Sequence, residues 1–129
     1  MRYNCKTGKE FELRFLYELY EYMRVNNVQC DVFQPLVDDN GIDYIIRTTN
    51  GLYREIQIKA RTKKRPFTID IDLQRYRDYW LLLYYNNDRY ILDKQDVKCE
   101  LSKKHINIAT ETNRHRTYKE RDFDSILRE

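Results

Sequence analysis

Polar and apolar residues alternate without interruption from Glu55 to Lys59. A repeat of two residues is the mark of a β-strand that has one dry face and one polar face. Ile56 and Ile58 point to one side of such a strand. Its other side carries three polar side chains, Glu55, Gln57 and Lys59. An exposed strand would give the same pattern, so the partner strand decides what this one means.

The partner strand is expected over residues 42–48, with Asp43 near its start. Asn50-Gly51 follows it, and this dipeptide is a strong signal for a tight hairpin turn. An antiparallel return brings Gln57 and Lys59 back beside Asp43. Carboxylate and amide oxygens suit a hard cation such as Mg²⁺. An ammonium group beside them can position an attacking water or stabilise a phosphate oxygen.

These residues resemble the motif of the PD-(D/E)XK nuclease superfamily, in which an Asp on one strand is followed by (Asp/Glu)-X-Lys on the next. Asp43 matches the first position and Lys59 matches the lysine, whereas Gln57 occupies the acidic position. Mrr-type restriction enzymes and their relatives carry the same Gln-X-Lys variant. The resemblance covers about residues 8–97. It implies a restriction-endonuclease-like α/β fold with an αβββαβ core, in which helices flank a mixed central sheet.

The resemblance also implies an activity, which is Mg²⁺- or Mn²⁺-dependent hydrolysis of DNA phosphodiesters. Asp43 and the Gln57 side-chain oxygen would hold the metal, and Lys59 would help to orient the attacking hydroxide. Glu55 faces the same side as Gln57. It either supplies the charge that Gln57 lacks, or it lies one strand step too far away and is solvated.

The superfamily often supplies another acid from its first helix, and four glutamates are available, namely Glu10, Glu12, Glu18 and Glu21. At about 100° per residue, six apolar residues of this helix form one stripe. They are Phe11, Phe15, Leu16, Leu19, Tyr22 and Met23. Glu12 falls near the middle of the stripe, where a carboxylate is costly unless it is paired or binds a metal. Glu12 is therefore the expected third metal ligand, and pairing with a lysine such as Lys59 is the alternative.

The start of this helix carries two further signals. Gly8 is followed four residues later by Glu12, which resembles the corresponding segment of archaeal Holliday-junction resolvases. Thr7 and Glu10 have the spacing of a capping box. Glu10 then serves the helix end rather than the site.

A chain of 129 residues is long enough for its own core, and we expect a single nuclease-like domain over residues 1–129. Helices are expected over residues 8–25, 73–79 and 123–127. Strands are expected over residues 28–34, 42–48, 52–60, 67–71, 80–85, 89–92 and 105–109. This order, one helix and three strands followed by a helix and a strand, agrees with the fold that the motif implies.

The net charge of +3 is small, but the basic residues cluster. Arg61, Lys63, Lys64 and Arg65 follow Lys59 directly, and a second cluster covers residues 114–121. Such clusters neutralise phosphates, so the first is the expected DNA-binding segment. The alternative for either cluster is an ordinary solvated loop.

Other classes of function lack their signals. No apolar run approaches the roughly 18 residues that span a bilayer, and the three cysteines form no CxxC pair, so we expect a cytoplasmic protein without zinc. No P-loop is present, and the two lone histidines, His105 and His115, are expected at the surface.

Cutting two strands requires two active sites, so a homodimer acting on DNA is expected, with RNA not excluded. A rival interpretation is an inactive nucleic-acid-binding or assembly module on the same fold. Gln57 favours this rival, because one formal charge is missing from the cation site. A purely structural interaction protein is a third possibility, and it predicts no DNA affinity.

Overall fold

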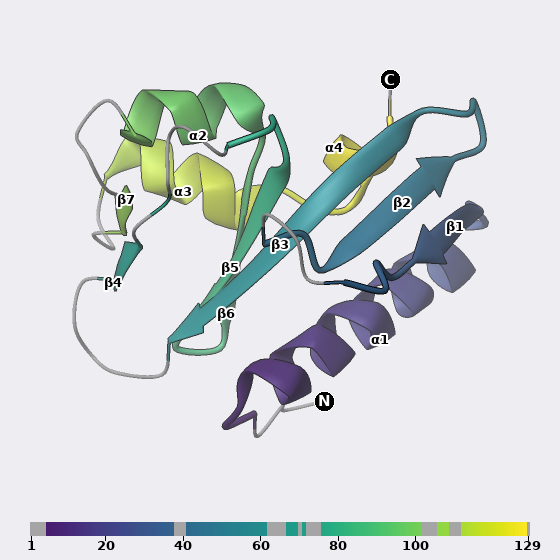
Figure 1. Ribbon diagram of the computed structural model, residues 1–129, viewed down its shortest axis with the longest axis horizontal. Coiled ribbons are helices and arrows are strands. Elements are labelled where there is room, and N and C mark those ends of the chain that lie inside the picture. The colour runs from purple at the N-terminus through teal and green to yellow at the C-terminus, as the bar shows by residue number, and fades with distance from the viewer. Residues whose placement is uncertain are drawn as a thin grey trace.

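Figure 1 shows the computed structural model, which describes residues 5–37, 41–61, 67–69, 71, 76–101, 106–108 and 112–128. In chain order the elements are α1 (Gly8–Asn26), β1 (Cys30–Phe33), β2 (Tyr44–Thr48), β3 (Tyr53–Arg61), β4 (Phe67–Ile69), β5 (Trp80–Tyr85), β6 (Asp88–Leu92), α2 (Lys94–Leu101), β7 (Ile106–Ile108), α3 (Asn113–Glu120) and α4 (Asp124–Leu127). Among the described helices, none combines the length and apolar character needed to cross a membrane.

The main sheet has five strands in the order β1-β2-β3-β5-β6. Strands β3 and β5 run parallel, and every other neighbouring pair is antiparallel, so the sheet is mixed. The predicted fold class, a mixed sheet flanked by helices, is confirmed. A small second sheet pairs β4 with β7.

Alternation along β3 and β5 separates the two faces of the sheet, and each face has its own core. Ile56 belongs to the core under α1 and α4, which also contains Tyr44 from β2 and Leu82 from β5. Leu81 and Leu83 lie on either side of Leu82 in β5 and point to the other face of the sheet. They belong to the second core, under α2 and α3. Figure 1 shows α2 and α3 at the β5–β6 end of the sheet, with β1 and β2 at the other end.

Helix α1 begins and ends as its sequence predicts. The Thr7 hydroxyl accepts a hydrogen bond from the Glu10 N–H, and the Glu10 carboxylate accepts one from the Lys6 N–H, so the capping box is formed. Asn27 ends the helix in the left-handed conformation, with a φ of 52°. Asparagine tolerates this conformation better than most residues, which explains why the helix stops here.

One buried residue of α1 is not apolar. Arg14 lies over the Tyr84 ring at 4.6 Å and donates to the carbonyl oxygen of Asn87 at 2.8 Å. Glu18 lies 3.4 Å from the Arg14 guanidinium and accepts a hydrogen bond from the Tyr84 hydroxyl at 2.7 Å. Because the charge is paired and bonded, its burial is tolerated, and the contact ties α1 to the β5–β6 hairpin.

The secondary structure differs from the sequence-based prediction at three helices. The helix predicted over residues 73–79 is wrong for its described part, because residues 76–79 are not helical and Asp78 has a φ of 62°. Its remaining residues lie outside the described part of the chain. Helices α2 and α3 were not predicted.

Helix α3 also corrects the prediction for His115, which is buried rather than exposed. The carboxylate of Glu100 on α2 lies 2.8 Å from Arg114 and 3.5 Å from His115, and it accepts a hydrogen bond from Tyr118. These ionic and aromatic contacts hold α2 against α3 in place of the aliphatic stripe that predicts a helix. His105 lies outside the described residues.

Candidate active site

The β2–β3 hairpin opens at Asp43. Its backbone N–H donates to the carbonyl oxygen of Ile56 at 2.9 Å, and its carboxylate accepts from the backbone N–H of Ile58 at 2.7 Å. The Asp43 side chain therefore takes the place of a backbone carbonyl where the two strands separate. The Ile58 N–H lies between Gln57 and Lys59 in the chain, so the carboxylate is held next to both of these residues.

Gln57 lies beside Asp43, because Asp43 is hydrogen-bonded to Ile56 and Ile58, the two neighbours of Gln57 in the chain. The Gln57 side chain is only 8% exposed. Its amide oxygen, Oε1, is buried and has no hydrogen-bond partner within the described residues. A buried acceptor without a partner is costly in a folded protein, and a bound cation is one way to satisfy it.

Gly41 forms the wall behind the Gln57 amide. Its φ is +75°, and a Cβ atom at this position would overlap Gln57 Nε2 and lie 3.3 Å from Gln57 Cδ. The absence of a side chain at Gly41 thus allows the amide to lie flat against the backbone. The sequence signal was visible as Gly41-Ile42-Asp43, although its role was not.

Lys59 alternates with Gln57 along β3 and so shares its face of the strand. No carboxylate in the described part of the chain forms an ion pair with it. Lys59 also lines a hollow of about 390 Å³ between the end of β3 and the first turn of α1. Two further cations, Lys6 and Arg61, line the same hollow, and the contribution of Lys6 was not predicted.

Glu12 lies beside Tyr44, the residue that follows Asp43. Burial is the largest cause that raises the pKa of Tyr44 to about 12, and the charge and hydrogen bond of Glu12 come next, followed by the charge of Asp43. Glu12 therefore contacts the Tyr44 hydroxyl, and Tyr44 belongs to the core under α1. Glu10 is occupied in the capping box of α1, away from this group.

Two solved structures are similar to this chain over nearly their whole length. One is a bacterial homing endonuclease, I-Ssp6803I, with 18% sequence identity and a TM-score of 0.60 over 95% of this chain and 93% of that one. The other is Hjc, a Holliday junction resolvase from Archaeoglobus fulgidus, with 14% identity and a TM-score of 0.61 over 95% of this chain and 96% of that one. The fold is restriction-endonuclease-like. No family model matches the chain, and no curated protein matches it significantly.

Within this restriction-endonuclease-like fold, Glu55 lies apart from the candidate site. It forms an ion pair with Arg77 at 2.7 Å, one strand step away from Gln57. The described residues contain no group of three or more histidines, cysteines and acids that could hold a metal ion. Asp43 and Gln57 are brought together by the hairpin, whereas Glu12 contacts Tyr44 in the core under α1, and no hydrogen bond or ion pair joins Glu12 to Gln57 among the described residues.

The two basic clusters differ in their surroundings, as far as their residues are described. Arg61 lines the hollow beside Lys59, and Lys63, Lys64 and Arg65 lie outside the described residues. In the second cluster, three cations already have carboxylate partners in the fold. These pairs are Arg114 with Glu100, Lys119 with Asp88, and Arg121 with Asp96.

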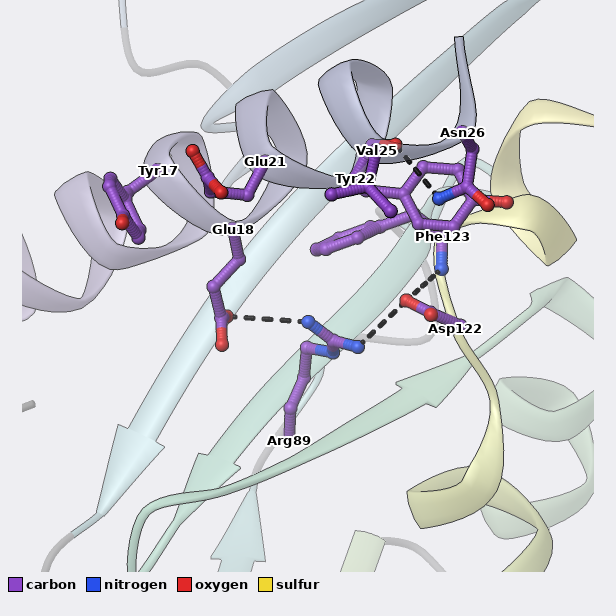
Figure 2. Close-up of a pocket in the computed structure, with 9 residues that line it drawn as sticks. All are labelled: Tyr17, Glu18, Glu21, Tyr22, Val25, Asn26, Arg89, Asp122 and Phe123. Atoms are coloured by element: carbon purple, nitrogen blue, oxygen red, sulfur yellow. Dashed lines mark hydrogen bonds and ion pairs between the residues drawn. The ribbon is translucent and has the colours of Figure 1, made fainter. Parts of the chain in front are cut away.

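A further hollow, of about 410 Å³, lies between α1 and the segment that enters α4 (Figure 2). Its lining carries three carboxylates, Glu18, Glu21 and Asp122. Among the described residues that line it, Arg89 is the one cation, and it is held by Glu18 at 3.4 Å and Asp122 at 3.0 Å. This hollow would repel phosphates, so it is not a candidate nucleic-acid site.

Proposed function

We propose that the protein is a metal-dependent endonuclease that hydrolyses DNA phosphodiester bonds. The single observation that carries the proposal is that the Asp43 carboxylate, held by the Ile58 N–H, lies beside Gln57, whose buried amide oxygen has no hydrogen-bond partner among the described residues. The restriction-endonuclease-like fold supports it, because similar chains of this fold include a homing endonuclease and a Holliday junction resolvase.

In this proposal Asp43, Gln57 and Glu12 supply the oxygen ligands for Mg²⁺ or Mn²⁺. The metal would lower the pKa of an attacking water and screen charge on the phosphate. Lys59 faces the same side as Gln57, where its ammonium group would orient the water and stabilise charge that develops on the phosphate oxygens. Cutting both strands of a duplex would take two subunits, so we also propose a homodimer.

Two substitutions at Gln57 test the ligand set. Gln57→Glu is expected to keep or raise Mn²⁺ affinity measured by calorimetry, because it adds a charge at an oxygen ligand. Gln57→Leu is expected to weaken Mn²⁺ binding by roughly tenfold or more. The Gln57→Leu substitution should not lower the melting temperature, because it removes a buried polar atom that has no partner among the described residues.

The rival interpretation, an inactive binding module, makes the opposite prediction for the same experiment. Wild-type protein would then bind no Mn²⁺ and nick no duplex, flapped, single-stranded or four-way DNA, nor RNA, while retaining salt-sensitive DNA affinity. A protein with no nucleic-acid affinity at all would support the purely structural alternative.

The hollow between β3 and α1 predicts the path of the DNA backbone. Neutralising Lys6 and Arg61 together should weaken binding about equally for unrelated sequences, because phosphate contacts carry no sequence information. The slope of log affinity against log salt should flatten by about 0.9 for each phosphate that is no longer neutralised. Fluorescence anisotropy over a salt series measures this slope. Lys63, Lys64 and Arg65 are expected to behave in the same way.

A matched control is the double substitution Arg24→Ala and Lys98→Ala, which removes two cations from the last turns of α1 and α2. This control should leave the slope unchanged. If both double variants flatten the slope equally, the effect comes from net charge and the proposed path is wrong.

A further inference from the structure

One face of the sheet beside the candidate site is left uncovered by the described elements. Helices α1 and α4 pack on the opposite face of the sheet, and α2 and α3 pack toward β5 and β6. On β1 the uncovered face carries Phe33, which is 44% exposed. At the start of β3 it carries Tyr53, which is 61% exposed. Arg47 on β2 lies between them, with its side chain 43% exposed. We call these three residues the open platform.

The open platform is ordered by its own contacts. The Arg47 guanidinium lies over the Phe33 ring at 5.4 Å and forms an ion pair with Asp31 at 2.6 Å. Hydrogen bonds to Asp31 and then to Tyr53 raise the pKa of Arg47. The guanidinium therefore lies over one aromatic ring and is hydrogen-bonded to Tyr53, and all three groups are presented to solvent.

Strand register connects the open platform to the candidate site. Arg47 is opposite Tyr53, and Ile45 is opposite both Phe33 and Glu55. Since alternate residues share a face, Tyr53 lies on the same side of β3 as Gln57. Four residues of strand separate them by about 13–14 Å. At the ~3.4 Å rise of a stacked strand, this distance is about four nucleotides, and fewer for a stretched strand.

We propose that the open platform binds unpaired bases next to the phosphate that is cut, so that the preferred substrate is DNA with a single-stranded segment beside a duplex. This inference rests on the proposed nuclease function and adds a substrate class to it. Tyr53 and Phe33 would stack on bases, and Arg47 would contribute a cation to the same surface.

Unpaired bases fit the open platform better than an intact duplex or a second copy of the chain does. An intact duplex hides the faces of its bases, so it would use phosphate contacts and leave two exposed rings unused. A second copy of the chain would favour an apolar interface whose core lacks charge, whereas the centre of the open platform is a guanidinium. Aromatic rings beside an arginine are the chemistry with which proteins hold single strands.

The test compares three DNAs with the same number of phosphates in buffer with chelator, so that binding is measured without cleavage. One is a blunt duplex, one carries a single-stranded overhang, and one carries an overhang of abasic residues that has phosphates but no bases. Wild-type protein is expected to bind the overhang with bases most tightly. Tyr53→Ala should lower that affinity by about tenfold, the size of one base stack, and change the other two by less than twofold.

Three variants serve as comparisons. Phe33→Ala should act in the same direction as Tyr53→Ala, and Tyr53→Phe should retain wild-type affinity because it keeps the ring. Tyr20→Ala removes a tyrosine of similar exposure, 62%, from α1, which packs on the opposite face of the sheet. It should change binding to none of the three DNAs.

Equal wild-type affinity for the two overhangs, or equal loss on all three DNAs in Tyr53→Ala, would overturn the inference. The inference would also be overturned if Tyr53→Ala converted a dimer into a monomer in sedimentation, since the platform would then be a self-association surface. If the platform inference failed in one of these ways but the protein still nicked duplex DNA, the nuclease proposal would survive. A wild-type protein that bound no DNA would contradict both the nuclease proposal and the platform inference.

Discussion

Asp43→Asn is expected to abolish DNA cleavage while leaving the fold intact. An asparagine oxygen can still accept the hydrogen bond from the Ile58 N–H, now made at 2.7 Å, so the hairpin keeps its geometry. The substitution removes the negative charge that would hold the cation. We expect a loss of at least about 10²–10³-fold in single-turnover cleavage of labelled DNA with Mg²⁺, and an unchanged thermal melt.

Lys59→Met is the companion to this substitution, and it separates two roles. It should lower the cleavage rate to a similar degree, but calorimetric Mn²⁺ binding should persist, whereas Asp43→Asn should weaken it. Lys94→Met, at an exposed lysine on the first turn of α2, is the control and should retain full activity. Cleavage that survived in Asp43→Asn would point to a contaminating nuclease or to a different active site.

The hairpin was predictable because its signals are local. Alternation from Glu55 to Lys59 fixes which side chains share a face, and Asn50-Gly51 fixes the turn, where Gly51 adopts a φ of +82°. Together they determine the register of β2 and β3, which brings Asp43 beside Gln57 where the pairing ends at Tyr44 and Ile56. A strand slip of one residue would have moved every side chain to the other face, so the pattern admits one solution.

The helical layer over β5 and β6 was less predictable, because its contacts join distant segments. Helix α3 buries His115 and Tyr118, neither of which marks a core position in sequence. Their partner Glu100 lies on another helix and is itself buried. A buried carboxylate appears in sequence as a surface residue until its partners are known.

The candidate site also combines features that local sequence predicts with features that depend on contacts between distant segments. Spacing was enough to predict that Asp43, Gln57 and Lys59 share one hairpin, whereas the choice of Glu12 over Glu10 from helix periodicity stays a prediction. Lys6 gave no signal, because it precedes α1 and meets β3 only through the packing of the helix on the sheet. The roles of these residues in metal binding and catalysis stay predictions.

Gly41→Ala is expected to lower the cleavage rate by about 10²-fold, the usual consequence of displacing an active-site group by about an ångström. The new methyl group would overlap the Gln57 amide, which is the flexible partner and must move. The Gln57 amide would then leave its place beside Asp43. Mn²⁺ binding should weaken in parallel, and both effects can be measured by the same calorimetry and single-turnover assays.

Gly51→Ala is the matched control, because it separates backbone strain from displacement of Gln57. Gly51 also has a positive φ, +82°, but a Cβ atom there would meet nothing within 4 Å. Each substitution should cost roughly 1–2 kcal/mol of stability, since both force alanine into the left-handed region. Only Gly41→Ala should also lose metal affinity and cleavage at a temperature where both variants are folded. Equal losses of activity in the two variants would show that Gly41 supports the hairpin alone, and that the position of the Gln57 amide does not control the reaction.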